Sequence, residues 1–473
     1  MFQKISKFFL YASVFSIALV ATSTFFPFIG VKYYFFRVVI ELALLFYLLY
    51  WAFEAKINEV KNRLLEVSRR PLFIAVSIFV LAFLLASIFA LNSHAAFWSN
   101  FERGEGGFQM IHYYLFFFLL IIQLKEWKEW RLLFWLSVGA AFLMVLYGFL
   151  AQVGVNGLIS PLRGDTSGLS ISDRIFSPRF QGSLGNPAYV APYLLFTLFF
   201  TSYLWLVDSK KTKSSRFLIY GGLSLVFLLF FILSQTRGAF LGLIGAIFAF
   251  FICSIIISSK RRKINSYILL GIILVGSIFI VFRHNPIIQK LPGSRLLQIA
   301  DTGYETDSIR TRLWTWGSAW RAFKDRPIFG WGPENFSAAF DKHFDPRHFS
   351  PEKNSETWFD RAHSIVFDYL STTGLIGFLA YLSIFIIFFR NLFQGNKFIE
   401  KNNINPQQLD ANMPHFKKAP LLTSLMFAVI IGYLIQGLAL FDVLPIYLNL
   451  FIVLAFASYI FSSNKLKANE PNN

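Results

Sequence analysis

The chain has 473 residues, of which 55% are hydrophobic and only 15% are charged. Soluble domains carry about 25% charged residues and their cores stop growing near about 300 residues, so the composition excludes both a soluble enzyme and a disordered chain. The single cysteine, Cys253, excludes an intrachain disulfide and a cysteine-based zinc site. The net charge of +18 has to be divided among the loops before it is interpreted as a binding surface.

The apolar residues are gathered in segments long enough to cross a membrane. A helix needs about 20 mostly apolar residues to span about 30 Å of hydrocarbon. The sequence therefore predicts an all-α integral membrane protein with about twelve transmembrane helices. The predicted spans are 8–28, 34–53, 72–91, 110–123, 132–153, 187–207, 218–234, 238–258, 267–283, 364–388, 420–440 and 448–463.

The first predicted span also has features of a secretory signal peptide. Ala21-Thr22-Ser23 resembles a small-residue cleavage site. The apolar run nevertheless continues to Phe28, which favours a span that is retained.

The positive charges predict which side of the membrane each loop occupies. Connections on the side of the N-terminus carry 25 of the 44 Lys and Arg residues, and short connections on the other side carry seven. Cytoplasmic loops are enriched in Lys and Arg, so both termini are predicted in the cytoplasm of a bacterium-like cell. The remaining 12 lie in one segment, 283–363, and long translocated loops escape the charge rule.

These assignments divide the chain into three parts. We expect an N-terminal transmembrane bundle over 1–283, a long extracytoplasmic loop over 284–363, and C-terminal transmembrane helices with a tail over 364–473. Because the polar residues are concentrated in the outer loops, function is predicted at the outer face of the plasma membrane.

Two outer loops carry arginines beside glycine-rich turns. Arg103 and Glu105 lie in one, and in the other Arg179 leads through glycines to Asn186-Pro187 at the start of a span. Glycines and an Asn-Pro step predict a defined turn. The simpler interpretation of both arginines is turn chemistry with anchoring at the membrane interface.

A third arginine lies where two spans are joined with almost no loop, in Ser234-Gln235-Thr236-Arg237-Gly238. A cation at membrane depth costs at least about 2.5 kcal/mol if it faces lipid. Arg237 is therefore predicted to face a cavity or a partner, next to Gly238 for close backbone approach. The alternative is that its side chain extends to the outer interface.

The long outer loop contains a predicted helix from about Asp307 to Asp325, which Pro327 ends. Basic residues such as Arg312 lie off its apolar stripe. The helix could simply lie on the membrane with these residues toward the headgroups, or one arginine could face inward and bind a phosphate. The stripe, with steps of three and four residues, consists of Ile309, Leu313, Trp316, Trp320 and Phe323.

Three histidines follow in the same loop. His343 and His348 are five residues apart among prolines, which is a weak pattern for zinc. His363 closes the loop beside Arg361, where the next span begins, and is placed for acid–base chemistry. The alternative is a hydrogen-bonded histidine at the membrane interface.

The arginines form a pattern when they are taken together. Arg179, Arg237 and Arg312 are predicted on one face of the membrane, as is His363. Arginine is suited to bidentate phosphate recognition, and no acidic cluster suitable for Mg²⁺ stands out nearby. A cationic outer pocket of this kind suits a lipid diphosphate headgroup.

Four ordered elements resemble the bacterial O-antigen ligase and O-antigen polymerase superfamily of membrane proteins. The resemblance covers about residues 8–463 and does not separate ligase from polymerase. The family commonly has Asn after the histidine, whereas this chain has Ser364, which reaches less far. The four elements are Arg179 through Asn186-Pro187; Ser234 to Gly238; Arg312-Leu313-Trp314-Thr315-Trp316 with Pro327, Gly330, Gly332 and Phe336; and Arg361-Ala362-His363-Ser364 with Thr373-Gly374-Leu375-Ile376-Gly377.

The resemblance implies a glycosyltransferase that moves a glycan from undecaprenyl diphosphate to an acceptor hydroxyl, on a lipid or protein, at the outer leaflet. It implies that Arg237 and Arg312 bind the diphosphate, with Arg179 in support, and that His363 activates the acceptor. The membrane lipids are its surroundings, and no metal, other cofactor or nucleic acid is expected. The supporting residues would be Gly238, Asn186, Arg361 and Ser364.

Two alternatives stay open from the sequence. One is a polymerase that joins lipid-linked repeats to one another. The other, less favoured, is a transporter of lipid-linked sugar, which would have charged or broken helices at mid-membrane and paired repeats. The concentration of polar residues in one outer loop disfavours transport.

Overall fold

The computed structural model of the protein describes residues 1–100, 103–155, 157–159, 170–176, 178–208, 212–258, 261–290, 294, 296–297, 307–349, 357–401 and 419–466. Within these ranges the regular structure is helical, with no strand. Ten helices in this part of the chain are long and apolar enough to cross a membrane. The predicted all-α, multi-spanning fold is thus confirmed.

The spanning helices follow the predicted segments closely. One span is made of three consecutive elements, α10 (Lys213–Arg216), the π-helical turn η3 (Phe217–Gly221) and α11. Helix α6 (Gly107–Gln123) is apolar but shorter than the spans. The spans are α2 (Gly30–Phe53), α4 (Pro71–Ile88), α7 (Trp127–Gln152), α9 (Pro187–Val207), α11 (Gly222–Leu233), α12 (Arg237–Ile257), α13 (Arg262–Val281), α17 (Ile365–Lys401), α18 (Ala419–Gly437) and α19 (Leu444–Leu466).

Shorter helices connect the spans. They are α3 (Ile57–Ser68), α5 (Ser93–Trp98), α8 (Ile171–Phe176), η2 (Gly182–Leu184), α14 (Pro286–Gln289), α15 (Asp307–Asp325), α16 (Phe336–Lys342) and η6 (Pro346–His348).

The first predicted span, 8–28, is wrong in its bounds. Helix α1 (Phe2–Ala12) begins earlier and continues as the 3-10 helix η1 (Ser13–Ala18), after which the chain turns back toward α2. The Ala21 N–H donates to the Pro27 carbonyl across this turn, at 3.2 Å. The polar residues at 22–24 and Pro27 favour a turn over continued helix, so the apolar composition of 25–28 misled the prediction.

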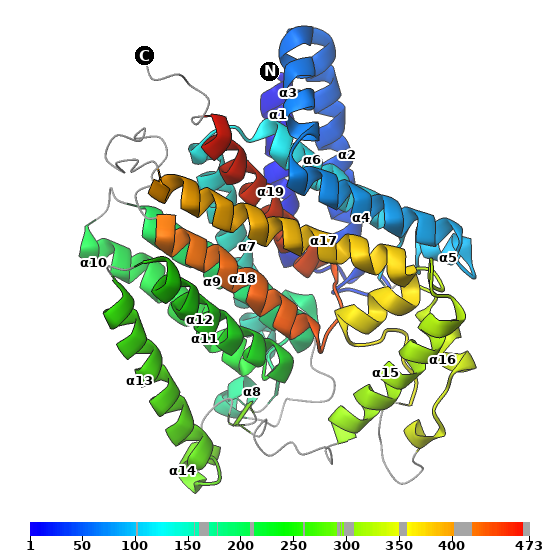
Figure 1. Ribbon diagram of the computed structural model, residues 1–473. Helices are drawn as coiled ribbons and strands as arrows, with labels where there is room; N and C mark the ends of the chain where they lie inside the picture. The colour runs from blue at the N-terminus through cyan, green and yellow to red at the C-terminus, as the bar shows by residue number, and fades with distance from the viewer. Residues whose placement is uncertain are drawn as a thin grey trace.

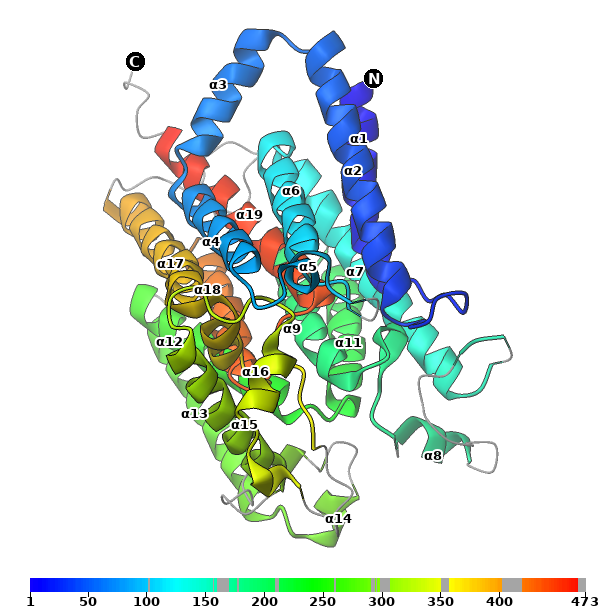
Figure 2. The same cartoon turned by 90° about the vertical axis from the view of Figure 1, so that its right-hand side faces the viewer.

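The two ends of the bundle differ in what they carry. The start of α1 and the end of α19 lie at one end, and α15 and α16 lie at the other (Figures 1 and 2). This arrangement agrees with termini on one side of a membrane and the long loop on the opposite side. Which side is cytoplasmic stays a prediction.

The centre of the bundle is formed by α9 and α19, the most deeply buried of the spans. A set of buried tyrosines surrounds the start of α19. The hydroxyls of Tyr369 and Tyr447 are 2.7 Å apart, and Tyr433 donates to Asp442 Oδ2 at 2.7 Å. Because unpaired polar groups are costly in a dry interior, these hydrogen bonds hold α17, α18 and the turn before α19 in one arrangement.

Helices α12 and α18 approach each other closely through small residues. A side chain at Gly242 would come 2.7 Å from the Gly432 carbonyl oxygen, and one at Gly238 would come 3.2 Å from Ala439 Cβ. Small residues of this kind allow two membrane helices to pack backbone to backbone. The contact sets the position of Arg237, the first residue of α12.

Helix α17 is kinked at Gly374, whose φ of 65° and ψ of −167° strongly favour glycine. We call residues 327–332 the clamp segment, because they bind the backbone on both sides of this kink. A side chain at Gly374 would come 2.3 Å from the Ile328 carbonyl oxygen. The joining hydrogen bonds run from Trp331 N to Ser371 O (2.9 Å), from Gly332 N to Thr372 O (2.8 Å) and from Leu375 N to Pro327 O (2.8 Å).

Helix α15 has the bounds expected from the sequence, and its apolar stripe is divided between exposed and packed side chains. Leu313 and Trp320, from the apolar stripe, are exposed. Trp316 packs instead on α17, where its ring stacks on Phe367 with centroids 5.2 Å apart. The side chains that are buried are small ones: Thr315, Ser318, Ala319 and Ala322.

Candidate functional site

His363 lies in the connection just before α17, with a left-handed backbone (φ 53°). Its ring is held edge-on between Phe359 and Phe441, at centroid distances of 5.4 and 5.2 Å. Its Nδ1 lies 3.1 Å from the Arg361 carbonyl oxygen. A carbonyl can only accept a hydrogen bond, so this contact puts the proton on Nδ1 and leaves Nε2 able to accept one.

The surroundings keep this imidazole neutral. Burial, with smaller contributions from the positive charges of Arg312 and Arg103, lowers the pKa of His363 to about 4. The Arg361 carbonyl and Asp360 act in the opposite direction but are outweighed. At neutral pH the ring is therefore the free base, as an acceptor of protons must be.

Arg361 is buried among three carboxylates. Its guanidinium lies 2.6 Å from Glu334, 3.0 Å from Asp368 and 3.5 Å from Glu105. Burial alone would lower the pKa of Arg361, but the three acids raise it well above its ordinary value. The side chain thus ties loops 103–106 and 332–335 to α17, while its carbonyl oxygen orients His363.

Glu105 is one of the two fully buried acids of this group. Its Oε1 accepts a hydrogen bond from the Leu444 N–H at 2.8 Å. Burial raises the pKa of Glu105 to about 8, although Arg361 and Arg103 oppose the shift. The group is therefore largely protonated at neutral pH, which reduces the repulsion among carboxylates that share one arginine.

Arg103, which the sequence places in an outer loop but does not assign to the site, lies next to His363 in the structure. It pairs with Asp360 at 2.8 Å and lies over the Phe441 ring at 5.0 Å. Its Nε and Nη1 are buried and have no hydrogen-bond acceptor among the described residues. A guanidinium that keeps two donors beside His363 is able to bind an anion.

Arg312 reaches the same place from α15. Trp316, one helical turn later, donates from Nε1 to the Ala362 carbonyl at 3.0 Å. Residues four apart share a helix face, so Arg312 lies on the side of α15 that faces His363. The influence of its charge on the His363 pKa agrees with this position.

Arg179 holds the turn that precedes α12. Its Nε donates to the Ser234 carbonyl at 3.0 Å and its Nη2 to Thr236 Oγ1 at 3.1 Å. Thr236 Oγ1 in turn donates to the Pro187 carbonyl at 2.9 Å. Asn186 caps α9 by accepting from the Ala188 N–H at 2.9 Å. Both sequence-predicted residues thus have structural contacts that fix where α9 and α12 begin.

The turn between α18 and α19 contacts both the residues around His363 and the starts of α9 and α12. Gly238 faces Ala439 in this turn, and two residues later Phe441 contacts His363. Tyr189, in the first turn of α9, also packs on Phe441, with centroids 6.4 Å apart. The starts of α9 and α12, and with them Arg237, therefore lie around the same turn as His363.

Strained backbone is confined to this region. In the part of the chain that the structure describes, four residues other than glycine have positive φ: Ser99, Gln235, Glu334 and His363. Gln235 precedes the start of α12, and the Ser99 hydroxyl donates to Glu334 at 2.9 Å. Such conformations cost about 1–3 kcal/mol each and collect at functional sites.

The remaining predicted residues have clear surroundings. Ser364 is buried, and its carbonyl accepts the Asp368 N–H at 2.8 Å in the first turn of α17. His343 contacts Asp325 at 2.8 Å, and His348 is buried among aromatic rings. Among the described residues no group of three or more His, Cys, Asp or Glu side chains could hold a metal ion.

Together these features define a multi-spanning membrane protein with arginines and a neutral histidine gathered at one end. Residues 222–382 match the family model described as O-antigen ligase. The match includes Arg237, Arg312 and His363, and it confirms the predicted resemblance to the O-antigen ligase and polymerase superfamily. Comparison with curated proteins gives no match to the chain.

Proposed function

We propose that the protein is an O-antigen ligase-like glycosyltransferase. It moves a glycan from an undecaprenyl diphosphate carrier to a hydroxyl of a lipid or protein acceptor, at the outer face of the bacterial cytoplasmic membrane. The observation that carries the proposal is the neutral His363, with Nε2 able to accept a proton, next to Arg312 and Arg103. The family match over 222–382 supports the reaction class.

In the proposed reaction the acceptor hydroxyl gives its proton to His363 Nε2. Its oxygen forms a bond to the anomeric carbon of the glycan as the bond from that carbon to the diphosphate oxygen breaks. The negative charge that develops on the leaving diphosphate is stabilised by Arg237 and Arg312, with Arg179 in support. Charge neutralisation by guanidinium groups takes the place that a divalent cation has in other diphosphate sites.

The donor itself would strengthen the base. A pKa of about 4 keeps His363 neutral but makes it a weak proton acceptor. A diphosphate bound at Arg312 places negative charge near the imidazole, and an opposite charge nearby raises the pKa of a cationic group. Proton transfer would therefore become more favourable once the donor is in place.

A polymerase of lipid-linked repeats would use the same chemistry, with a second lipid-linked glycan as the acceptor. The two functions are separated by the lipid-linked glycans of cells that lack the protein, resolved by chain length on a gel. For the ligase we expect long chains retained on the carrier. Single repeat units alone would instead make the protein the polymerase, and an unchanged pool would exclude both.

A further inference from the structure

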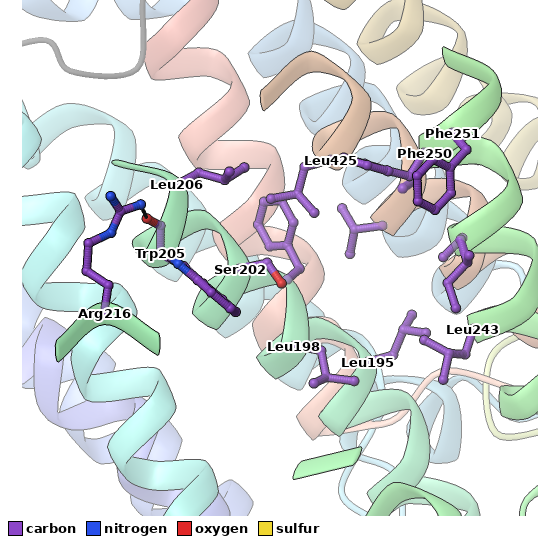
Figure 3. A pocket seen from close by; sticks show the side chains of 15 residues that line it. Leu195, Leu198, Ser202, Trp205, Leu206, Arg216, Leu243, Phe250, Phe251 and Leu425 are labelled. Carbon is purple, nitrogen blue, oxygen red and sulfur yellow. Dashed lines mark hydrogen bonds between the residues drawn. The ribbon is translucent and has the colours of Figure 1, made fainter. Parts of the chain in front are cut away.

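An apolar groove lies between α9, α12 and α18, with a cavity volume of about 530 Å³. Proteins bind small ligands in cavities of roughly 300–1,000 Å³. All but one of the α9 residues that line it lie in the second half of that helix, away from its start at the candidate site. Figure 3 shows lining side chains from the three helices, among them Leu195, Leu198, Ser202, Leu243, Phe250 and Leu425.

One edge of the groove is charged. Arg216 of α10 lies there beside Trp205 and is the one charged residue among those that line the groove (Figure 3). Its Nη2 donates to the Trp205 carbonyl at 2.5 Å, and its buried Nε has no acceptor in the described part of the chain. Asp208, the nearest carboxylate along the chain, accepts from Tyr220 at 2.6 Å and lies 3.5 Å from Arg131.

We propose that this groove binds an acyl chain of an anionic phospholipid whose phosphate lies at Arg216. The apolar lining excludes a polar ligand, and a bilayer supplies chains directly to helices that span it. A cation at the membrane surface favours an anionic headgroup. The site lies outside the residues assigned above to glycan transfer.

The direction of the groove argues against the lipid tail of the proposed donor as its ligand. The donor's diphosphate is assigned to the end of the bundle where α12 begins, at Arg237. Arg216 lies at the opposite end, because α11 runs from it toward the start of α12. A ligand with its charged group at Arg216 therefore enters from the other membrane surface.

The probe for this site is phosphatidylglycerol with a photoreactive group in one acyl chain, mixed with the purified full-length protein. We expect labelling of peptides that contain Ser202, Leu243 or Leu425. Ser202→Trp fills the groove and should lower this labelling severalfold. The matched control Ser224→Trp, on α11 outside the groove, should leave it unchanged. Equal labelling of the wild type and Ser202→Trp would overturn the proposal.

A second variant tests the headgroup without filling the groove. Arg216→Gln should reduce the preference for phosphatidylglycerol over phosphatidylcholine about fivefold, the effect of one surface cation on an anionic lipid. Arg262→Gln, which removes an exposed arginine at the start of α13, should have no effect on it. The proposal fails if the wild type shows no such preference, or if undecaprenyl phosphate displaces the label and phosphatidylglycerol does not.

Discussion

His363 depends on its neighbours for both its conformation and its charge. Two aromatic rings and the Arg361 carbonyl hold a side chain whose backbone is in the left-handed region. Burial keeps the imidazole neutral by lowering its pKa, with smaller contributions from the nearby guanidinium groups of Arg312 and Arg103. The hydrogen bond to Arg361 is the one expected of a hydrogen-bonded histidine at the membrane interface. The role of His363 as a base therefore stays a prediction.

Removing this imidazole tests the proposed base. His363→Ala should lower transfer by about 10²–10⁴-fold, the usual contribution of a general base, while insertion and expression are retained. The assay is transfer of a lipid-linked glycan to its acceptor by the purified protein. The control is His94→Ala, which removes an exposed histidine of α5. Full activity of His363→Ala would exclude it as the base.

Two substitutions should move the pKa of His363 in opposite directions. Arg312→Gln removes a positive charge that disfavours the imidazolium, so the pKa should rise from about 4. Asp360→Asn removes a negative charge that favours it, so the pKa should fall. Titration of ¹³C-labelled histidine by NMR, with His363→Ala to assign the signal, measures both. Shifts of the same sign would contradict the site described here.

Within the helices, the fold requires glycine at some positions and tolerates other residues at others. Gly374 combines a backbone that favours glycine with a contact too close for any side chain. At Gly271, in the exposed helix α13, a Cβ would meet no described atom within 4 Å apart from its own helix backbone and chain neighbours. The resemblance in the sequence included Gly374, and the structure explains it as the point where α17 receives the clamp segment.

Gly374→Ala should therefore unfold this part of the protein. The backbone conformation alone costs about 1–3 kcal/mol, and overlap with the Ile328 carbonyl adds to it. We expect a large loss of folded protein, measured by size-exclusion chromatography and thermal unfolding. Gly271→Ala should be neutral or slightly stabilising, because alanine favours helix. Equal behaviour of the two variants would disprove the role given to the clamp segment.

The ends of a helix could be predicted from the sequence wherever residues such as Asn-Pro or proline mark them. Asn186-Pro187 and the apolar run to Val207 define α9, and α15 begins and ends where its polar residues and Pro327 suggested. The place of Arg103 in the site could not be predicted in this way, although the sequence puts this residue in an outer loop. Its partners, Asp360 and Phe441, are more than 250 residues away along the chain, and such contacts leave no local pattern.

At the scale of the whole molecule, buried acids couple stability to pH. The pKa of Glu105 is about 8 in the folded protein and near 4.5 for an ordinary glutamate. Over this interval the folded chain holds a proton that the unfolded chain releases. The free energy of unfolding from this group is therefore greatest below pH 4.5 and falls as the pH rises to 8.

Glu105→Gln should weaken this pH dependence. Glutamine keeps an oxygen that can accept the Leu444 N–H but carries no titratable proton. Between pH 5 and 8 the wild type should lose roughly 1–4 kcal/mol more of its unfolding free energy than the variant. Thermal unfolding followed by tryptophan fluorescence across this range measures the difference. Identical slopes for the two proteins would refute it.

The positive charge of the whole site predicts that transfer does not depend on a metal ion. Because guanidinium groups are proposed to neutralise the diphosphate, EDTA should leave transfer by the purified protein unchanged. The control is a metal-dependent glycosyltransferase assayed in parallel, which should lose activity. Loss of transfer on chelation, restored by one divalent ion, would show that the arginines are insufficient.

The hydrogen bonds of the clamp segment also bear on the order in which the long loop and α17 fold. Its N–H groups at 331 and 332 find their acceptors at 371 and 372, some forty residues later in the chain. During synthesis these N–H groups are made about forty residues before their acceptors. We therefore expect the long loop to reach its native form only after the first turns of α17 are in place, so that folding of the loop depends on that helix.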